Sequence, residues 1–151
     1  MDSKVVLLVE DNRDDERLTL RALRKNNIMN EVVVACDGEE ALDYLFGRGK
    51  HADRDHGCLP AVVLLDLKLP GMTGIDVLRE IRANEETKLL PVVVLTNSED
   101  PAQAALCFEN GANSFVRKPV DPQEFSETIL QIGLYWLLLN ETATNGAGLV
   151  V

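Results

Sequence analysis

Asp66 is the residue whose place in the sequence most strongly indicates chemistry. It ends the apolar run 61–65, and the turn-forming pair Pro70 and Gly71 follows closely. An unbroken run of valine and leucine suits a strand that is buried on both faces of a parallel sheet. An acid at the carboxyl end of such a strand lies at the edge where open α/β folds bind ligands. A lone aspartate there is more often the start of a turn, so the case depends on what else reaches that edge.

Four further polar residues stand at the ends of other predicted strands. Glu10 and Asp11 follow the apolar run 5–9, Thr96 ends the run 91–96, and Lys118 comes just after a short strand at 113–116. In a parallel sheet all these strand ends meet at one edge. We therefore expect three carboxylates, one hydroxyl and one ammonium group to face the same crevice.

This set of groups favours phosphoryl chemistry with a metal ion. Three neighbouring carboxylates repel one another and call for a hard cation, and Mg²⁺ binds oxygen ligands while keeping waters that a phosphoryl oxygen can replace. Asp66, the central acid, can act as a nucleophile and form an acyl phosphate. Phosphoryl transfer needs mainly positioning and charge neutralisation, which Mg²⁺, Lys118 and Thr96 would supply.

The elements that must position these groups alternate along the chain. We expect strands at 5–9, 31–36, 62–66, 91–96 and 113–116, and helices at 13–25, 39–46, 73–84, 101–110 and 122–139. Regular strand-helix alternation predicts an α/β fold, a doubly wound (βα)5 unit with a parallel sheet and helices on both faces. Residues 1–140 would form one domain, and 141–151 a flexible tail.

Composition excludes several other classes of protein. The formal net charge of -10 argues against non-specific binding to nucleic acid. No apolar stretch reaches the roughly 18 residues that a membrane span needs, and the first residues show no signal-peptide pattern, so we expect a cytoplasmic protein with no membrane partner. Three dispersed cysteines, Cys36, Cys58 and Cys107, indicate reduced thiols.

Residues 47–60 form a long polar connection that contains both histidines of the chain. His51, Asp53, Asp55 and His56 are close enough in sequence to suggest a metal site. Their spacing fits no helix-borne or turn-borne ligand set, so an exposed, mobile loop is the favoured interpretation.

Taken together, the motifs resemble the receiver domain of bacterial two-component response regulators over residues 4–139. The resemblance implies the flavodoxin-like strand order 2-1-3-4-5, with Glu10-Asp11 as the acidic pair and Asp66 as the acceptor of a phosphoryl group from a sensor histidine kinase. Thr96 and Phe115 would be the switch residues, and the surface formed by 101–110, 113–116 and the last helix would change. The Lys118-Pro119 bond would be cis.

A narrower resemblance rests on the opening segment 8–12, the long loop after the second helix, the segment 67–70 and the ending 135–137. These features resemble the small single-domain regulators that partner bacterial phytochromes, and such regulators tend to form dimers. The resemblance makes the backbone carbonyl of Lys68 a metal ligand beside Glu10, Asp11 and Asp66, and lets Ser98 tune dephosphorylation. Glu10 replaces a commoner aspartate. We expect the Lys68 ammonium to pair with Glu10 when Mg²⁺ is absent.

The last predicted helix carries more apolar residues than one buried face needs, between Ile129 and Leu139. This excess favours a symmetric homodimer through that helix and its neighbours. The alternative is that the tail, with Leu149, Val150 and Val151, covers the helix end.

Four other functions remain open or are disfavoured. A phosphatase of the haloacid dehalogenase type needs a second acid two residues after the nucleophile, where this chain has Lys68. A phosphate-independent interaction module would keep the fold alone, and an intermediate of a phosphorelay would pass the group on. A DNA-binding regulator is excluded, because about 12 residues after the last helix cannot form a helix-turn-helix domain. The chain would catalyse its own phosphorylation and dephosphorylation and no other reaction.

Overall fold

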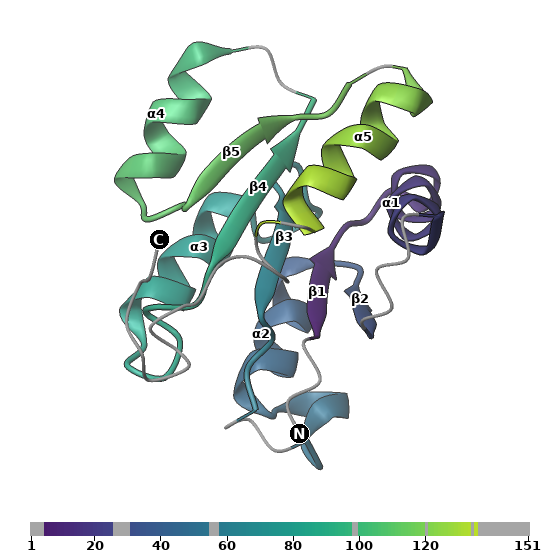
Figure 1. Cartoon of the computed structure of the whole chain (residues 1–151). Helices are drawn as coiled ribbons and strands as arrows, with labels where there is room; N and C mark the ends of the chain where they lie inside the picture. Colours follow the sequence, from purple (N-terminus) through teal and green to yellow (C-terminus); the bar gives the residue numbers. More distant parts are fainter. Residues whose placement is uncertain are drawn as a thin grey trace.

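The computed structural model describes residues 5–25, 31–54, 58–97, 100–119, 121–133 and 135. Within these residues a five-stranded parallel sheet has the order β2-β1-β3-β4-β5, as predicted (Figure 1). The elements in chain order are β1 (Val6–Val9), α1 (Arg13–Lys25), β2 (Val32–Ala35), α2 (Gly38–Phe46), a 3-10 helix (Gly49–His51), β3 (Val62–Asp66), α3 (Gly74–Ala83), β4 (Val92–Thr96), α4 (Pro101–Glu109), β5 (Ser114–Arg117) and α5 (Pro122–Gly133).

The parallel register brings the ends of the strands together at one edge. Val9 pairs with Leu65, Asp66 pairs with Leu95, and Thr96 pairs with Arg117. All residues of β1, β3 and β4 are buried, which explains their unbroken apolar sequences. Only the last residues of β3 and β4 are polar, and these therefore lie at the common edge.

Two hydrophobic clusters cover the two faces of the sheet. One contains alternate strand residues, such as Leu7 and Val63, packed against α2, α3 and Cys107 of α4. The other contains the intervening residues, such as Leu8 and Leu64, packed against α1 and α5. Figure 1 shows the same division, with α1 and α5 together on one side of the sheet. The predicted doubly wound architecture is thus confirmed.

Two helix starts are fixed beside the polar edge. Asn12 accepts hydrogen bonds through Oδ1 from the backbone N–H groups of Asp14 and Asp15 and so caps the start of α1. Thr73 and Asp76 form a capping box at α3. A Cβ at Gly74 would lie 2.6 Å from the carbonyl oxygen of Asp66. Glycine is therefore required where α3 approaches the end of β3.

The described part of the segment 47–60 is mostly exposed, as predicted, and specific contacts also hold it against α2. Arg54 donates through Nε to the carbonyl oxygen of Tyr44 at 2.7 Å and through Nη1 to that of Cys58 at 2.7 Å. Its guanidinium lies 4.0 Å from the centre of the Tyr44 ring, and His51 meets that ring edge-on. Cation-π and hydrogen-bond contacts hold this segment, and neither follows from its polar composition. Asp55 and His56 lie outside the described residues.

Helix α5 is described to Gly133, whereas the sequence predicts a helix to residue 139. Tyr135 is 49% exposed. Residues 136–151, which include the predicted tail, lie outside the described residues. Among the residues described, no helix is long and apolar enough to cross a membrane.

Arg82 ties α3 to the turn between α4 and β5 through backbone carbonyls. Its guanidinium donates to the carbonyl oxygens of Leu90 at 2.7 Å and Gly111 at 2.9 Å, and to Oδ1 of Asn113 at 2.9 Å. That amide oxygen also accepts from the N–H of Val92 at 2.8 Å. Arg82 therefore links α3, β4 and the start of β5 in one network.

We predict that Arg82→Met lowers the free energy of unfolding by about 2–3 kcal/mol, because several half-buried acceptors lose their donor. Chemical denaturation followed by circular dichroism would measure the loss. Arg79→Met is the matched control on the same helix, since exposed Arg79 donates one bond, to Oδ1 of Asn110, and should cost less than about 1 kcal/mol. Equal losses in the two variants would contradict the prediction.

Candidate functional site

Three carboxylates meet at the carboxyl edge of the sheet. One oxygen from each of Glu10, Asp11 and Asp66 lies within 4.8 Å of the other two. Glu10 and Asp66 are 2% and 8% exposed, whereas Asp11 is exposed. The strand ends of β1 and β3 thus bring these acids together as predicted. Oxygen donors at this spacing fit a hard cation such as Mg²⁺, and that fit rests on the donor set itself.

Lys118 inserts its ammonium group among the acids. Its Nζ lies 2.7 Å from Oε1 of Glu10, 2.9 Å from Oδ2 of Asp15 and 3.4 Å from Oδ2 of Asp66. The Lys118 side chain is 6% exposed, so these pairs are shielded from solvent. An ammonium has three N–H donors, and three carboxylates are within reach of them.

Burial and pairing with an opposite charge act in opposite directions on the pKa values of Glu10 and Lys118. Burial is the largest effect on Glu10, and together with the hydrogen bond to Asp66 it raises the pKa of Glu10 to about 8, although Lys118 opposes the rise. Burial alone would lower the pKa of Lys118. The hydrogen bonds to Glu10 and Asp15 outweigh burial, and the net effect raises that pKa. Lys118 is therefore a permanent cation at neutral pH.

Thr96 lies at the same edge and is fully buried. Its carbonyl oxygen accepts a 2.7 Å hydrogen bond from the N–H of Lys118, which fixes the backbone of Lys118 to the end of β4. Thr96 also lines a hollow of about 810 Å³ together with Asp11 and Lys68. Thr96 and Lys118 are thus brought to the acids, as the sequence predicts.

The Lys118-Pro119 peptide bond is trans, because the described residues contain no cis bond. This corrects the expectation of a cis bond. The trans preference before proline is about 0.5–1 kcal/mol, so a sequence motif alone decides little. In the trans form the backbone N–H of Lys118 already reaches the Thr96 carbonyl, and its ammonium group reaches Glu10, Asp15 and Asp66.

The expected pairing of the Lys68 ammonium with Glu10 is also wrong. Lys68 is exposed, and the cation beside Glu10 is Lys118. The backbone N–H of Lys68 donates to Oδ1 of Asp66 at 3.2 Å, which places the Lys68 backbone next to the acceptor acid. Ser98 lies outside the described residues.

Phe115 lies on β5, opposite Val94, and is half-buried against the hydrophobic cluster on the α2, α3 and α4 face. It stands three residues before Lys118, but it belongs to the core rather than to the acid cluster. A switch role for Phe115 therefore remains a prediction.

Asp15 is the site residue that sequence reasoning missed. It lies in the first turn of α1, four residues after Asp11, and its side chain is 29% exposed. Acids are common in the first turn of a helix, where they interact favourably with the helix dipole, so Asp15 carried no distinct signal. Its position beside the strand-end acids was the one available clue.

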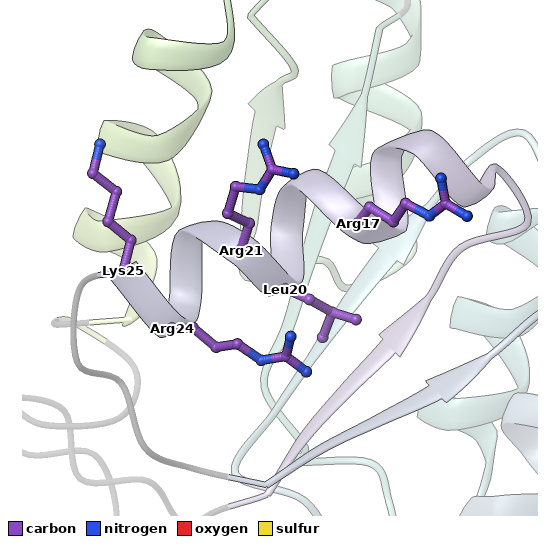
Figure 2. Close-up of a pocket in the computed structure, with 5 residues that line it drawn as sticks. All are labelled: Arg17, Leu20, Arg21, Arg24 and Lys25. Carbon is purple, nitrogen blue, oxygen red and sulfur yellow. The ribbon is translucent and has the colours of Figure 1, made fainter.

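A second hollow runs along the surface of α1. It has a volume of about 480 Å³ and is lined by Arg17, Leu20, Arg21, Arg24 and Lys25. Figure 2 shows these five side chains projecting from the single helix. Four of the five are cations, whereas the whole chain has a formal net charge of -10. The groove is thus a basic patch on an acidic protein.

Comparison with known proteins identifies relatives over nearly the whole chain. Residues 6–130 match the response regulator receiver domain. Response regulator Rcp1 of Synechocystis is 34% identical, over 93% of this chain and 92% of Rcp1.

Solved structures agree with that match. The Mn²⁺-bound form of Rcp1 superposes with a TM-score of 0.82 at 33% identity, covering 90% of this chain and 96% of that one. The phosphorylated cyanobacterial phytochrome response regulator RcpA gives 0.83 at 32%, covering 98% and 99%. The bacteriophytochrome response regulator AtBRR gives 0.74 at 47%, covering 93% and 100%. This chain therefore belongs to the response regulator receiver domain family, and is similar to the single-domain regulators within it.

Proposed function

We propose that this chain is a phosphorylation-driven signalling switch in which Asp66 accepts a phosphoryl group from a sensor histidine kinase. The observation that carries the proposal is the meeting of Glu10, Asp11 and Asp66 within 4.8 Å of one another, with Nζ of Lys118 3.4 Å from Asp66. The arrangement offers a nucleophile, a set of metal ligands and a fixed positive charge at one edge.

In the proposed reaction a carboxylate oxygen of Asp66 attacks the phosphorus atom of the phosphohistidine. The bond between phosphorus and the histidine nitrogen breaks, and its electron pair stays on that nitrogen. Lys118 and the Thr96 hydroxyl stabilise the phosphoryl oxygens on Asp66. Later attack by water at phosphorus breaks the bond between phosphorus and the Asp66 oxygen, which restores the carboxylate and releases inorganic phosphate. The chain has no separate substrate, so it acts as a switch rather than as an enzyme with turnover.

Glu10, Asp11, Asp66 and the backbone carbonyl of Lys68 would hold the metal ion in this proposal. Bound Mg²⁺ would neutralise charge on the transferring phosphoryl group. The Mn²⁺-bound form of Rcp1 supports a divalent cation, and phosphorylated RcpA supports a phosphoryl group. In this chain Asp66 supplies the carboxylate, and Thr96 the hydroxyl, that such a site needs.

Two of the similar solved structures are phytochrome response regulators, and this supports a bacteriophytochrome kinase as the donor. In the proposed output, Thr96 and Phe115 respond to the phosphoryl group and change the surface of α4, β5 and α5. That surface presents the exposed Phe108 and Tyr135, which supports a homodimer through α5 and its neighbours. A cytoplasmic location, without DNA or membrane as partner, completes the proposal. The alternatives are a relay intermediate and a phosphate-independent module.

The basic groove on α1 supports a docking site for an acidic face of the kinase. It begins at Arg17, two residues beyond Asp15, so a partner bound there lies beside the acceptor edge. Leu20 adds an apolar contact in the middle of the groove. Opposite charges would steer the encounter and fix its orientation.

Incubation with acetyl phosphate and Mg²⁺ should add the mass of one phosphoryl group to the intact chain, measured by mass spectrometry. The addition should disappear in Asp66→Asn and in the presence of EDTA, because the nucleophile or the cation is then missing. Asp53→Asn, which neutralises an exposed acid of the 47–54 segment, is the matched control and should still be phosphorylated. Addition that persists in Asp66→Asn would remove the proposed acceptor.

The docking proposal predicts that the double variant Arg21→Glu, Arg24→Glu slows transfer from a phosphorylated bacteriophytochrome kinase by about tenfold or more. Phosphorylation by acetyl phosphate should stay unchanged, since neither arginine contacts the acid cluster. The control is Lys50→Glu, Lys88→Glu, which changes the net charge equally at exposed lysines away from α1. Equal slowing in both double variants would mean that net charge, not the groove, guides the kinase.

A further inference from the structure

Asp15 is a fourth carboxylate at the site, and it stands apart from the three that can hold a metal. Its Oδ2 lies 2.9 Å from Nζ of Lys118, closer than the 3.4 Å between Nζ and Asp66. The group of oxygens suited to a cation contains Glu10, Asp11 and Asp66. Asp15 therefore contacts the lysine without belonging to that group.

The backbone of Asp15 is hydrogen-bonded on both sides of its Cα atom. Its N–H donates to Oδ1 of Asn12 at 3.0 Å, and its carbonyl oxygen accepts from the buried hydroxyl of Thr19 at 2.9 Å. Both bonds are local to the N-cap and α1, and they fix the first turn of the helix. The Asp15 carboxylate is thus presented to Lys118 by a rigid element rather than by a loop.

The ammonium of Lys118 and a divalent cation compete for two of the same carboxylates. Lys118 contacts Glu10 and Asp66, and both also belong to the metal-ligating group. A cation bound to these acids would draw on the same negative charge and so weaken the pairing of Lys118 with them. A buried ammonium still needs a partner of opposite charge. A partner outside the metal-ligating group would reduce the cost of that weakening.

We propose that Asp15 is a positioning residue that holds Lys118 on the α1 side of the site and so leaves Glu10 and Asp66 free for the cation. The inference rests on the proposed function, and assigns a role to a residue outside the ligand set. When the cation is bound, Lys118 keeps Asp15 as its partner and stays within reach of a phosphoryl group on Asp66.

Asp15→Asn should weaken Mg²⁺ binding about tenfold, the usual size of an effect from a residue that orients a ligand set. In this variant Lys118 turns back to Glu10 and Asp66 and competes with the cation. Isothermal titration calorimetry of the purified chain would measure the dissociation constant, and thermal unfolding would verify that the variant folds. Asp14→Asn is the matched control, because Asp14 is an exposed acid in the same helical turn. It should weaken binding less than twofold.

The decisive comparison repeats the Asp15→Asn substitution in a protein that already carries Lys118→Met. In Lys118→Met the competing ammonium is gone, so adding Asp15→Asn should change the Mg²⁺ affinity by less than about threefold. The same tenfold loss in that background would overturn the inference, because Asp15 would then act through its charge alone. Unchanged affinity in the single variant Asp15→Asn would overturn it as well.

These experiments separate a failure of the positioning role of Asp15 from a failure of the proposed function. If wild-type protein binds Mg²⁺ and is phosphorylated on Asp66, while Asp15 and Lys118 show no coupling, the inference alone fails. If the coupling in Mg²⁺ affinity is present but Asp66 takes up no phosphoryl group, the proposed function fails and the positioning role of Asp15 stands. If the wild type binds no Mg²⁺, both fail.

Discussion

The ion cluster at Lys118 is the interaction on which the organisation of the site depends. Glu10, Asp66 and Asp15 come from the end of β1, the end of β3 and the first turn of α1, and Lys118 follows β5. Without a cation these acids would repel one another in a mostly buried place. One lysine therefore couples the sheet edge to α1, and its buried position makes it the natural competitor of any metal ion there.

Much of the fold and of the acid cluster follows from one property of the sequence. The runs that form β1, β3 and β4 are apolar without interruption, which requires burial on both faces and hence a parallel sheet with helices on each side. Parallel strands align their carboxyl ends, so the polar residue that ends each run must reach the same edge. Asp66 and Thr96 were predictable for this reason, although the loops between them are long.

Other features depend on contacts between side chains that are distant in sequence. Whether Lys68 or Lys118 pairs with Glu10 depends on which ammonium the backbone directs inward, and both lysines follow the carboxyl end of a strand. Asp15 resembles any acid near a helix start. The packing of Arg54 on Tyr44 spans ten residues and has no periodic signal. The resemblance to a family implied a cis peptide bond before Pro119. The free-energy difference between the cis and trans forms is small, so a motif alone does not decide between them.

The charge pattern of α1 has two explanations that can be separated. Acids in its first turn and cations in its last turn both interact favourably with the helix dipole, so helix stability alone could account for Asp14, Asp15, Arg24 and Lys25. That explanation treats Asp14 and Asp15 as equivalent. The structure does not, because Asp15 contacts a buried ammonium and Asp14 is exposed. Nor does the dipole explain Arg17 and Arg21 in the middle of the helix, where its field is weak. These cations line the groove beside the acceptor edge, an arrangement that suits the acidic partner proposed for it.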